Sequence, residues 1–269
     1  MKETIKNSRY FGAVLIAPLL IFLFIGGVYL KLLTFLLGFI GMYEVYKVIR
    51  STNSYKPIPF LGYFLLILYY ALGMSIDNLG YIIIFFTLLL LCIPVINIEY
   101  NFIDAFITLG VFLYVGVFFS LITNIYMKPG GNYLVWLIFI SSWLGDTAAY
   151  YSGRYLGKRK LCPKVSPKKT VEGSIGGWLG SILGCGIFGI IIDPYLSMDI
   201  AIINYFLIGA AAGIMGQFGD LVASSIKRYF NVKDYSNLIP GHGGILDRFD
   251  SIIYSSVIIF FYLTFIVGI

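Results

Sequence analysis

The sequence predicts an all-α integral membrane protein with about nine transmembrane helices. Two observations support this fold class. The 269-residue chain is 59% hydrophobic and only 12% charged, with a mean hydropathy of +0.89, whereas a soluble domain has about 25% charged residues. The apolar residues also fall into successive runs of about 18–25 residues, the length that an α-helix needs to cross a bilayer.

The apolar runs follow one another after a short polar tail, 1–9. The first run has a basic flank like that of a secretory signal peptide. No small-residue cleavage site precedes a soluble domain, so we expect this run to be a retained helix. The predicted spans are Tyr10–Gly27, Tyr29–Val48, Pro57–Met74, Leu79–Ile98, Phe102–Tyr126, Tyr133–Tyr151, Gly173–Ile192, Ile200 to about Ser225, and Ser251–Ile269.

The positive charges predict how these spans are oriented. Lys and Arg collect in the cytoplasmic loops of membrane proteins. We therefore expect a multi-pass protein of the cell membrane with its N-terminus in the cytoplasm and its C-terminus outside. In this topology every Lys and Arg except Lys31 and Lys128 lies in a cytoplasmic segment. Those segments are 1–9, 47–56, 99–101, 152–172 and 226–250.

The whole chain, 1–269, is expected to form one polytopic membrane domain. Its first part, 1–130, is aliphatic and aromatic, so we interpret it as scaffold helices, with Glu44 and Asp104 as interfacial acids. The second part, 131–269, carries the long basic loop and the polar stretch described below, so we expect the catalytic residues there.

Composition also excludes several classes of function. The three cysteines, Cys92, Cys162 and Cys185, lie far apart and form no CxxC pair, which argues against a disulfide framework and a zinc site. The net charge of +6 is explained by basic cytoplasmic loops. No nucleic-acid-binding motif accompanies it, so we expect no nucleic-acid partner.

The most polar stretch of the chain is 216–250. Asp220, Ser224, Lys227 and Arg228 are spaced so that they share one face of a helix. A turn-rich loop follows over 231–244. After this loop, Asp247 and Asp250 are three residues apart and again share a helical face.

These residue types suit a metal-bound polyphosphate. Carboxylates are the hard oxygen ligands that Mg²⁺ prefers, Lys and Arg neutralise phosphate, and glycines let backbone amides approach an anion. Asp146 is a further acid, deep in the sixth apolar run, where a carboxylate normally faces a cavity or a partner. Converging carboxylates would repel one another unless a cation joined them.

A second polar segment precedes the seventh span. The loop 154–172 has seven basic residues and one acidic residue, and it ends in Ser-Pro-Lys-Lys-Thr-Val-Glu-Gly over 166–173. Part of this charge sets the topology. Lys168 and Lys169 are also candidates for binding a phosphate, with hydroxyls from Ser166 and Thr170. Glu172 lies where the seventh helix is expected to begin.

Both polar segments resemble one protein family. The pattern Ser225-Ile-Lys227-Arg228, then Lys233-Asp234, then Pro240-Gly-His242-Gly243-Gly244-Ile-Leu-Asp247-Arg248-Phe-Asp250 is similar to the signature of the phosphatidate cytidylyltransferases, or CDP-diacylglycerol synthases. The segment 166–173 resembles a second motif of that family, S-P-K-K-T-x-E-G. The resemblance implies that CTP and phosphatidate react to give CDP-diacylglycerol and pyrophosphate.

The residues fit that chemistry without a protein nucleophile. The attacking group is the lipid phosphate, which is largely dianionic at neutral pH because its second pKa lies at about 6. The chain accordingly shows no nucleophile–base motif such as GxSxG. Two polyanions must meet, which calls for Mg²⁺ on the CTP phosphates and for Lys and Arg around them.

These considerations give the candidate roles. We expect Asp220, Asp247, Lys227 and Arg248 to be catalytic, with Asp220 and Asp247 as metal ligands. Asp146 and Asp250 are expected as further ligands or as partners of the ligands, and this number of acids leaves room for a second cation beside Mg²⁺. Substrate-binding candidates are Ser166, Lys168, Lys169, Thr170, Glu172, Arg228, His242, Gly243 and Gly244.

Three alternatives stay open. Gly-rich helices with polar residues also suit a transporter, although here the charges cluster in cytoplasmic segments and no internal repeat is visible. Another membrane nucleotide–lipid transferase or kinase would share the general chemistry. The glycine spacing of the seventh and eighth spans, which include Gly176, Gly180, Gly184, Gly209 and Gly213, fits close helix packing within one chain or in a homodimer.

Overall fold

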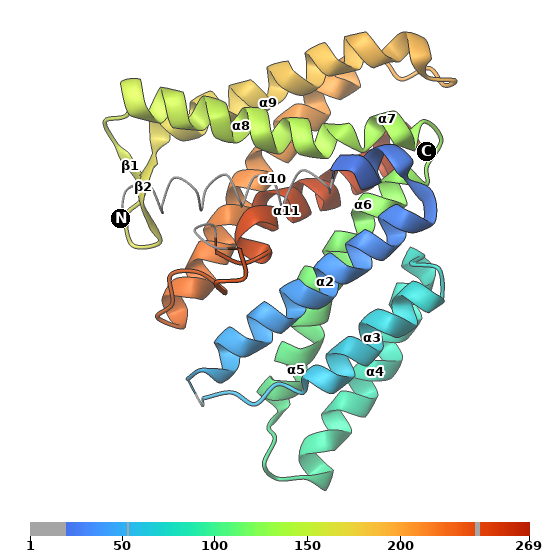
Figure 1. The fold of residues 1–269 in the computed structure, drawn as a ribbon, viewed down its shortest axis with the longest axis vertical. Helices are drawn as coiled ribbons and strands as arrows, with labels where there is room; N and C mark the ends of the chain where they lie inside the picture. Colours follow the sequence, from blue (N-terminus) through green and yellow to red (C-terminus); the bar gives the residue numbers. More distant parts are fainter. Residues whose placement is uncertain (1–19, 53, 240–242) are drawn as a thin grey trace. The chain divides into compact units, whose positions relative to one another are not determined.

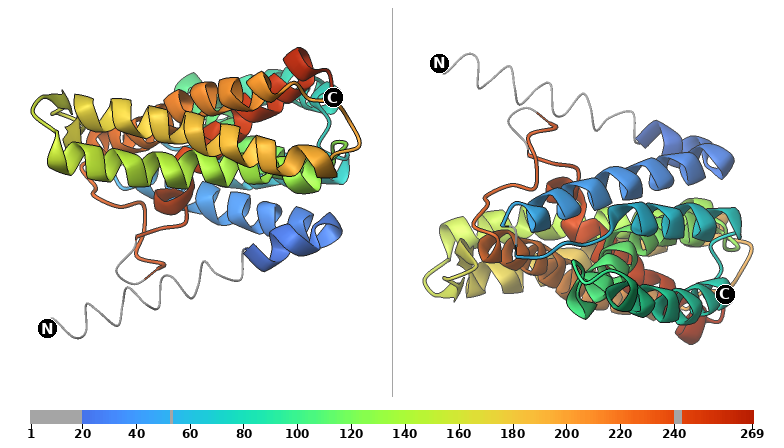
Figure 2. Two further views of the ribbon diagram at one scale, coloured as in Figure 1. Left: turned by 90° about the horizontal axis from the view of Figure 1, so that it is seen from above. Right: turned by 90° about the horizontal axis from the view of Figure 1, so that it is seen from below.

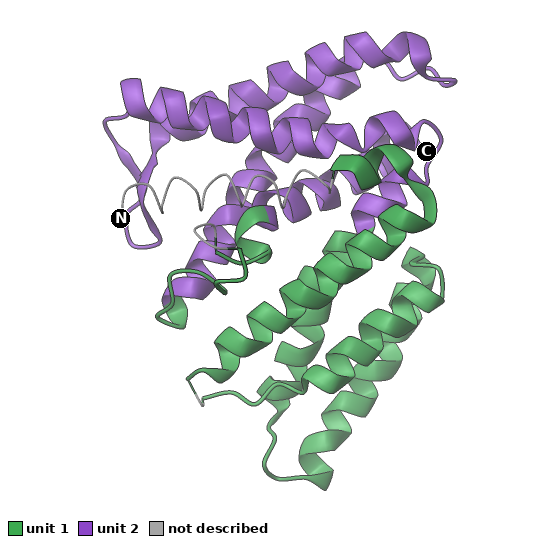
Figure 3. Cartoon of the chain, viewed as in Figure 1, with its two compact units in different colours: residues 1–120, 229–248 green, residues 121–228, 249–269 purple. Residues whose placement is uncertain are grey.

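The computed structural model describes residues 20–52, 54–239 and 243–269 (Figure 1). Nearly all regular structure in these ranges is helical, as the sequence predicts. Six helical segments among the described residues are long and apolar enough to cross a bilayer, so this is a multi-pass membrane protein. The chain divides into two compact units, 1–120 with 229–248 and 121–228 with 249–269 (Figure 3).

The first unit is a helical bundle with local start signals in its sequence. Pro59 lies in the first turn of one helix, Ser75 caps the next by accepting a hydrogen bond from the Asn78 amide, and Asn101 and Asp104 form a capping box. The helices are α2 (Gly27–Arg50), α3 (Pro59–Ala71), α4 (Ile76–Ile96) and α5 (Phe102–Val111). A π-helical segment η1 (Phe112–Val117) and α6 (Phe118–Tyr126) continue α5, and α6 passes into the second unit after residue 120.

The core of the first unit forms where α2, α3 and η1 meet. Met42, Leu65 and Phe112 are fully buried there. Gly41 allows α2 to approach η1 closely, because a Cβ atom at this position would lie 2.8 Å from Val115 Cγ1. Apolar burial and close helix approach therefore hold this unit together.

The second unit contains the remaining helices and a small hairpin. Its elements are α7 (Gly131–Leu134), α8 (Trp136–Tyr155), β1 (Lys160–Cys162), β2 (Ser166–Thr170), α9 (Val171–Ile192), η2 (Asp193–Tyr195), α10 (Ile202–Tyr229), α11 (Leu246–Tyr262) and η3 (Leu263–Val267). The first residues of α11 and the last of α10 belong to the first unit by the division above.

Within the second unit, α8 and α9 lie side by side along most of their length (Figure 2). The glycine stripe of α9 makes this possible. A Cβ atom at Gly177 would lie 2.9 Å from Ala149 Cβ, and one at Gly180 would lie 2.6 Å from Ala148 Cβ. Gly213 of α10 similarly faces Ser181 of α9. These glycines therefore pack within one chain, and the homodimer stays a prediction.

The six membrane-capable segments correspond to six of the predicted spans. They are Gly27–Arg50, Ile76–Ile96, Phe102–Tyr126, Val171–Tyr195, Ile202–Tyr229 and Leu246–Val267. The first predicted span falls largely outside the described residues. The third is a helix of only 13 residues, Pro59–Ala71, and the sixth is the helix Trp136–Tyr155, which is not among the apolar segments. The number of nine spans and the orientation of the termini stay predictions.

Three boundaries differ from the prediction. Helix α10 runs to Tyr229 rather than ending at about Ser225, and Asn231, with a left-handed φ of 54°, follows its end. Helix α11 begins at Leu246 rather than Ser251, because its polar first turn is helical as well. The loop 154–172 contains the antiparallel hairpin β1–β2, which pairs Lys160 with Thr170 and Cys162 with Ser166.

Candidate active site

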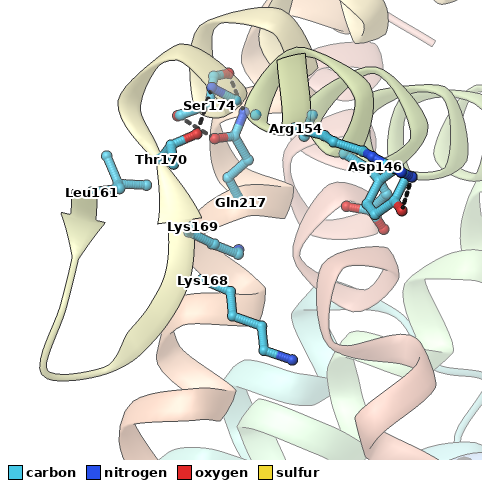
Figure 4. Close-up of a pocket in the computed structure, with 12 residues that line it drawn as sticks. Asp146, Arg154, Leu161, Lys168, Lys169, Thr170, Ser174 and Gln217 are labelled. Atoms are coloured by element: carbon cyan, nitrogen blue, oxygen red, sulfur yellow. Dashed lines mark hydrogen bonds between the residues drawn. The ribbon is translucent and has the colours of Figure 1, made fainter. Parts of the chain in front are cut away.

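A cavity of about 360 Å³ in the second unit collects several predicted site residues. Figure 4 shows the side chains that line it, from α8, the hairpin, α9 and α10. Four of them were predicted from the sequence: Asp146, Lys168, Lys169 and Thr170. The lining also includes Arg154, Ser174 and Gln217, which the sequence analysis did not single out.

The hairpin and the start of α9 are fixed by Thr170 and Glu172. Thr170 is the N-cap of α9, and its Oγ1 accepts a hydrogen bond from the Gly173 amide at 3.1 Å. Glu172 Oε2 accepts from the amides of Lys158 and Arg159 at 3.0 and 3.2 Å. The side chains of both residues therefore accept hydrogen bonds from backbone amides in this structure. Their role at the substrate stays a prediction.

An ion pair joins β2 to α10. Lys169 Nζ lies 2.6 Å from Asp220 Oδ2. The other oxygen of Asp220 accepts a longer hydrogen bond, 3.3 Å, from Ser224 Oγ, so these two residues share a helix face as predicted. Lys168, on the same strand, lines the cavity without an ion-pair partner among the described residues.

Asp250 lies within the electrostatic influence of two other carboxylates of the second unit. Asp250, on α11, is close enough to Asp220 and Asp146 to be repelled by both, and it is attracted by Lys227. Asp250 and Lys227 are buried, and Asp250 Oδ1 accepts a hydrogen bond from the Ser251 amide at 2.8 Å. Gly219 allows this approach of α10 and α11, because a Cβ atom there would collide with the Asp250 carbonyl oxygen.

This arrangement is suited to a hard divalent cation. The donor set consists of carboxylates, and their mutual repulsion is a cost that a bound cation would remove. Within the described ranges, no three His, Cys, Asp or Glu side chains are already gathered around one point. The residues fit a magnesium ion in their chemistry, and Lys169 and Lys227 are the cationic side chains beside them.

In the first unit, the loop before α11 is organised around Asp247. Its Oδ2 accepts hydrogen bonds from the amides of Tyr235 and Gly244 at 2.8 and 2.9 Å. Gly243 has a φ of +82°, and a Cβ atom there would lie 2.8 Å from the same Oδ2. Asp247 is 7% exposed. Predicted residue His242 lies outside the described residues.

Comparison with known proteins shows the family of this chain. A sequence profile described as the cytidylyltransferase family matches residues 7–266. The chain belongs to the cytidylyltransferase family. It is therefore an enzyme, as the two motifs predict.

Curated relatives of this cytidylyltransferase extend over most of the chain. The phosphatidate cytidylyltransferase of Staphylococcus saprophyticus is 35% identical over 233 residues, which cover 85% of this chain and 87% of the relative. That of Staphylococcus haemolyticus is 36% identical over 250 residues, covering 89% and 92%. That of Bacillus subtilis is 39% identical over 160 residues, covering 59% and 58%.

The structure of the cytidylyltransferase thus groups its predicted residues into two sets. The second unit contains Asp146, Ser166, Lys168, Lys169, Thr170, Glu172, Asp220, Lys227, Arg228 and Asp250, and the first contains Gly243, Gly244, Asp247 and Arg248. Asp247 and Asp250 lie in the first turn and a half of one helix, α11, as their spacing predicts.

Ser174 and Gln217 are two of the polar cavity residues that the sequence analysis did not single out. Ser174 Oγ donates to Gln217 Oε1, and Gln217 Nε2 donates to the Ser174 carbonyl at 3.0 Å, which joins α9 to α10. A signal was available for Gln217, because an amide three residues before Asp220 in an apolar run places two polar groups on one helix face.

Proposed function

We propose that this cytidylyltransferase transfers the cytidylyl group of CTP to phosphatidate, which gives CDP-diacylglycerol and pyrophosphate for phospholipid biosynthesis. The observation that carries the proposal is the cavity lined by Asp146 and the hairpin lysines Lys168 and Lys169, of which Lys169 is also paired with Asp220. Such a site neutralises phosphates and offers hard ligands at once. The names of the relatives and the membrane-capable helices support a lipid as the acceptor.

The reaction needs no covalent intermediate on the protein. An oxygen of the phosphatidate phosphate forms a bond to the α-phosphorus of CTP, and the bond from that phosphorus to the bridging oxygen of the β-phosphate breaks. Pyrophosphate leaves with the electron pair. The nucleophile is already largely dianionic at neutral pH, so the task of the enzyme is to hold two polyanions in line.

Basic residues perform much of that task in the proposal. Lys168 and Lys169 bind substrate phosphates, and Lys227, Arg228 and Arg248 offset the remaining negative charge. Lys169 can engage a phosphate when its present partner, Asp220, takes another cation. Ser166, Thr170, Glu172, Gly243 and Gly244 shape the loops that surround the phosphates, and His242 is assigned to phosphate contact or loop shape.

Magnesium is part of the proposal as a cofactor. Asp220, Asp146 and Asp250 are the residues that would hold it, and Asp247, three residues before Asp250 on α11, is assigned as a further ligand. Bound there, the ion would neutralise the CTP phosphates and the leaving pyrophosphate. The number of acids leaves room for a second cation.

The proposed enzyme works at the cytoplasmic face of the cell membrane. This orientation, with the N-terminus inside and the C-terminus outside, is supported by the basic segments 152–172 and 226–250. CTP would enter from the cytoplasm, and phosphatidate would enter sideways from the bilayer.

The direct test is pyrophosphate release by purified protein in detergent micelles. CTP is compared with ATP and GTP, phosphatidate with other phospholipids, and Mg²⁺ with a chelator. Release that requires CTP, phosphatidate and Mg²⁺ together is expected. Release with a different lipid acceptor would transfer the chemistry to another nucleotide–lipid transferase. No release with any pairing, from folded protein, would contradict the proposal and favour a transporter.

A further inference from the structure

Glu44 on α2 is a buried carboxylate without an ion-pair partner among the described residues. It is only 1% exposed. An ionised carboxylate in such a position is costly unless hydrogen bonds replace its water. Hydrogen bonds to a charged group are stronger than those between neutral groups, so the donors around this carboxylate are held firmly.

Among the described residues, the hydrogen-bond partners of the Glu44 carboxylate all belong to one loop and to the helix start that follows it. Glu44 Oε1 accepts hydrogen bonds from Ser236 Oγ at 2.6 Å and from the Ile245 amide at 2.9 Å. Its Oε2 accepts from the Leu246 amide at 2.9 Å. Leu246 is the first residue of α11, so the carboxylate also caps the positive end of that helix.

Gly244, in the same loop, packs directly against the Glu44 carboxylate. A Cβ atom at Gly244 would lie 2.5 Å from Glu44 Oε1 and 2.6 Å from Oε2. Any larger residue would displace the carboxylate, because real atoms do not approach so closely. A glycine in the family signature thus has a packing reason that is independent of phosphate approach.

Glu44 and Asp247 hold the loop together. We define the signature loop as residues 235–239 and 243–246. Within it, the amides of Tyr235 and Gly244 donate hydrogen bonds to Asp247. The Ser236 hydroxyl and the amides of Ile245 and Leu246 donate hydrogen bonds to Glu44. The amides of Gly244 and Ile245, which are neighbours in the chain, therefore donate to different carboxylates. We expect the orientation of the Asp247 side chain to depend on both sets of hydrogen bonds, its own and those of Glu44.

We propose that Glu44 is a positioning residue of the enzyme: it fixes the signature loop and the start of α11, and thereby the orientation of Asp247. The role in turnover rests on the proposed function, whereas the role in ordering the loop does not. From its position in the sequence, we interpret Glu44 as an interfacial acid of the scaffold helices. The structure instead connects it to a segment about 190 residues later in the chain.

The test compares Glu44→Gln with Asp104→Asn as a matched control. Asp104 is also 1% exposed and lies in the same unit. Its carboxylate accepts hydrogen bonds from the amides of Lys56 at 2.6 Å and Asn101 at 3.0 Å, and within the described part of the chain it makes none to the signature loop. Gln keeps one acceptor oxygen and turns an amide group toward donors, so Glu44→Gln loses hydrogen bonds at the loop.

The readouts are hydrogen–deuterium exchange of peptides covering 243–250 and steady-state kinetics of pyrophosphate release. Glu44→Gln is expected to speed exchange in these peptides and to lower kcat about 10- to 100-fold, with KM for CTP changed less than about three-fold. Glu44→Asp should recover part of kcat because it restores the charge. Asp104→Asn should change neither measurement relative to wild type once the folded fraction is matched.

A double substitution adds a second, independent test. Gly244→Ala should be severely impaired in the wild-type background, because its Cβ atom collides with Glu44. In a Glu44→Ala background, the same Gly244→Ala change should cost much less additional activity. Equal costs in the two backgrounds would overturn the contact.

The outcomes separate the two hypotheses. Wild-type exchange and kcat in Glu44→Gln would overturn the positioning role, whatever the substrate. Faster exchange at 243–250 in a protein that releases no pyrophosphate from CTP and phosphatidate would keep the ordering role and contradict the proposed function.

Discussion

Lys169 Nζ lies 2.6 Å from Asp220 Oδ2, so a phosphate-binding candidate and a metal-binding candidate are paired with each other. The side chains are 28% and 33% exposed, which lets solvent screen the pair. A triphosphate would compete with Asp220 for the lysine, and a cation would compete with Lys169 for the carboxylate. If both bound together, the Lys169–Asp220 ion pair would be replaced by a lysine–phosphate pair and a carboxylate–cation pair.

Replacing Lys169 with Met tests this exchange. Loss of a charge-assisted contact to phosphate should raise KM for CTP about 10- to 100-fold. The Mg²⁺ concentration for half-maximal activity should fall, because no lysine competes for Asp220. Stability should change by about 1 kcal/mol or less, since the pair is partly exposed to solvent, which screens it. Lys164→Met, which removes an exposed charge from the same hairpin, is the control, and equal kinetics of the two variants would contradict the assignment.

Asp220→Asn and Asp250→Asn test the metal site. Each replaces a charged oxygen ligand by a weaker neutral one, so pyrophosphate release should fall by more than about 100-fold and should not recover at high Mg²⁺. Ser224→Ala serves as the control, because its hydroxyl makes only a 3.3 Å contact with Asp220. Near-normal rates and an unchanged Mg²⁺ requirement in both Asn variants would show that neither carboxylate binds the ion.

Asp247 has two separable tasks, which Asn and Ala distinguish. In Asp247→Asn an oxygen can still accept the amides of Tyr235 and Gly244, whereas Asp247→Ala loses both hydrogen bonds. The Ala variant should lose about 1–3 kcal/mol more unfolding free energy than the Asn variant. Both should lose turnover, because the negative charge is gone. Thermal unfolding in one detergent and pyrophosphate release measure the two effects, and an active Asn variant would remove Asp247 from the metal ligands.

Helical periodicity predicted much of the local arrangement. The spacing of Asp220 and Ser224 placed them on one face, and a hydrogen bond joins them. The spacing of Asp247 and Asp250 placed both in one helical segment, and α11 begins one residue before the first of them. Such relations extend over one or two turns of a helix, so the sequence contains all the information that they need.

Contacts between distant segments could not be predicted in this way. Nothing near Glu44 in the sequence indicates that it caps α11, because its partners depend on how α2 packs against the signature loop. Thr170 and Glu172 show a related difficulty. Their motif suggests phosphate binding, and the same residues cap α9 and bind loop amides. A polar side chain can hydrogen-bond to the backbone or contact a substrate, and the residue type does not distinguish these two roles.

Gly180→Ala tests the packing that supports Asp146. An added Cβ atom would lie 2.6 Å from Ala148 Cβ and 3.0 Å from the Leu144 carbonyl oxygen, so α8 and α9 must separate. We expect a loss of about 1–3 kcal/mol of unfolding free energy and a fall in turnover, because α8 carries Asp146 in the turn next to Ala148. Gly110→Ala is the control, since a Cβ atom there meets nothing within 4 Å and the change should stabilise its helix by about 0.5–1 kcal/mol. Thermal unfolding in one detergent compares the two. Equal stability of the two variants would mean that α8 and α9 do not pack this closely in the membrane.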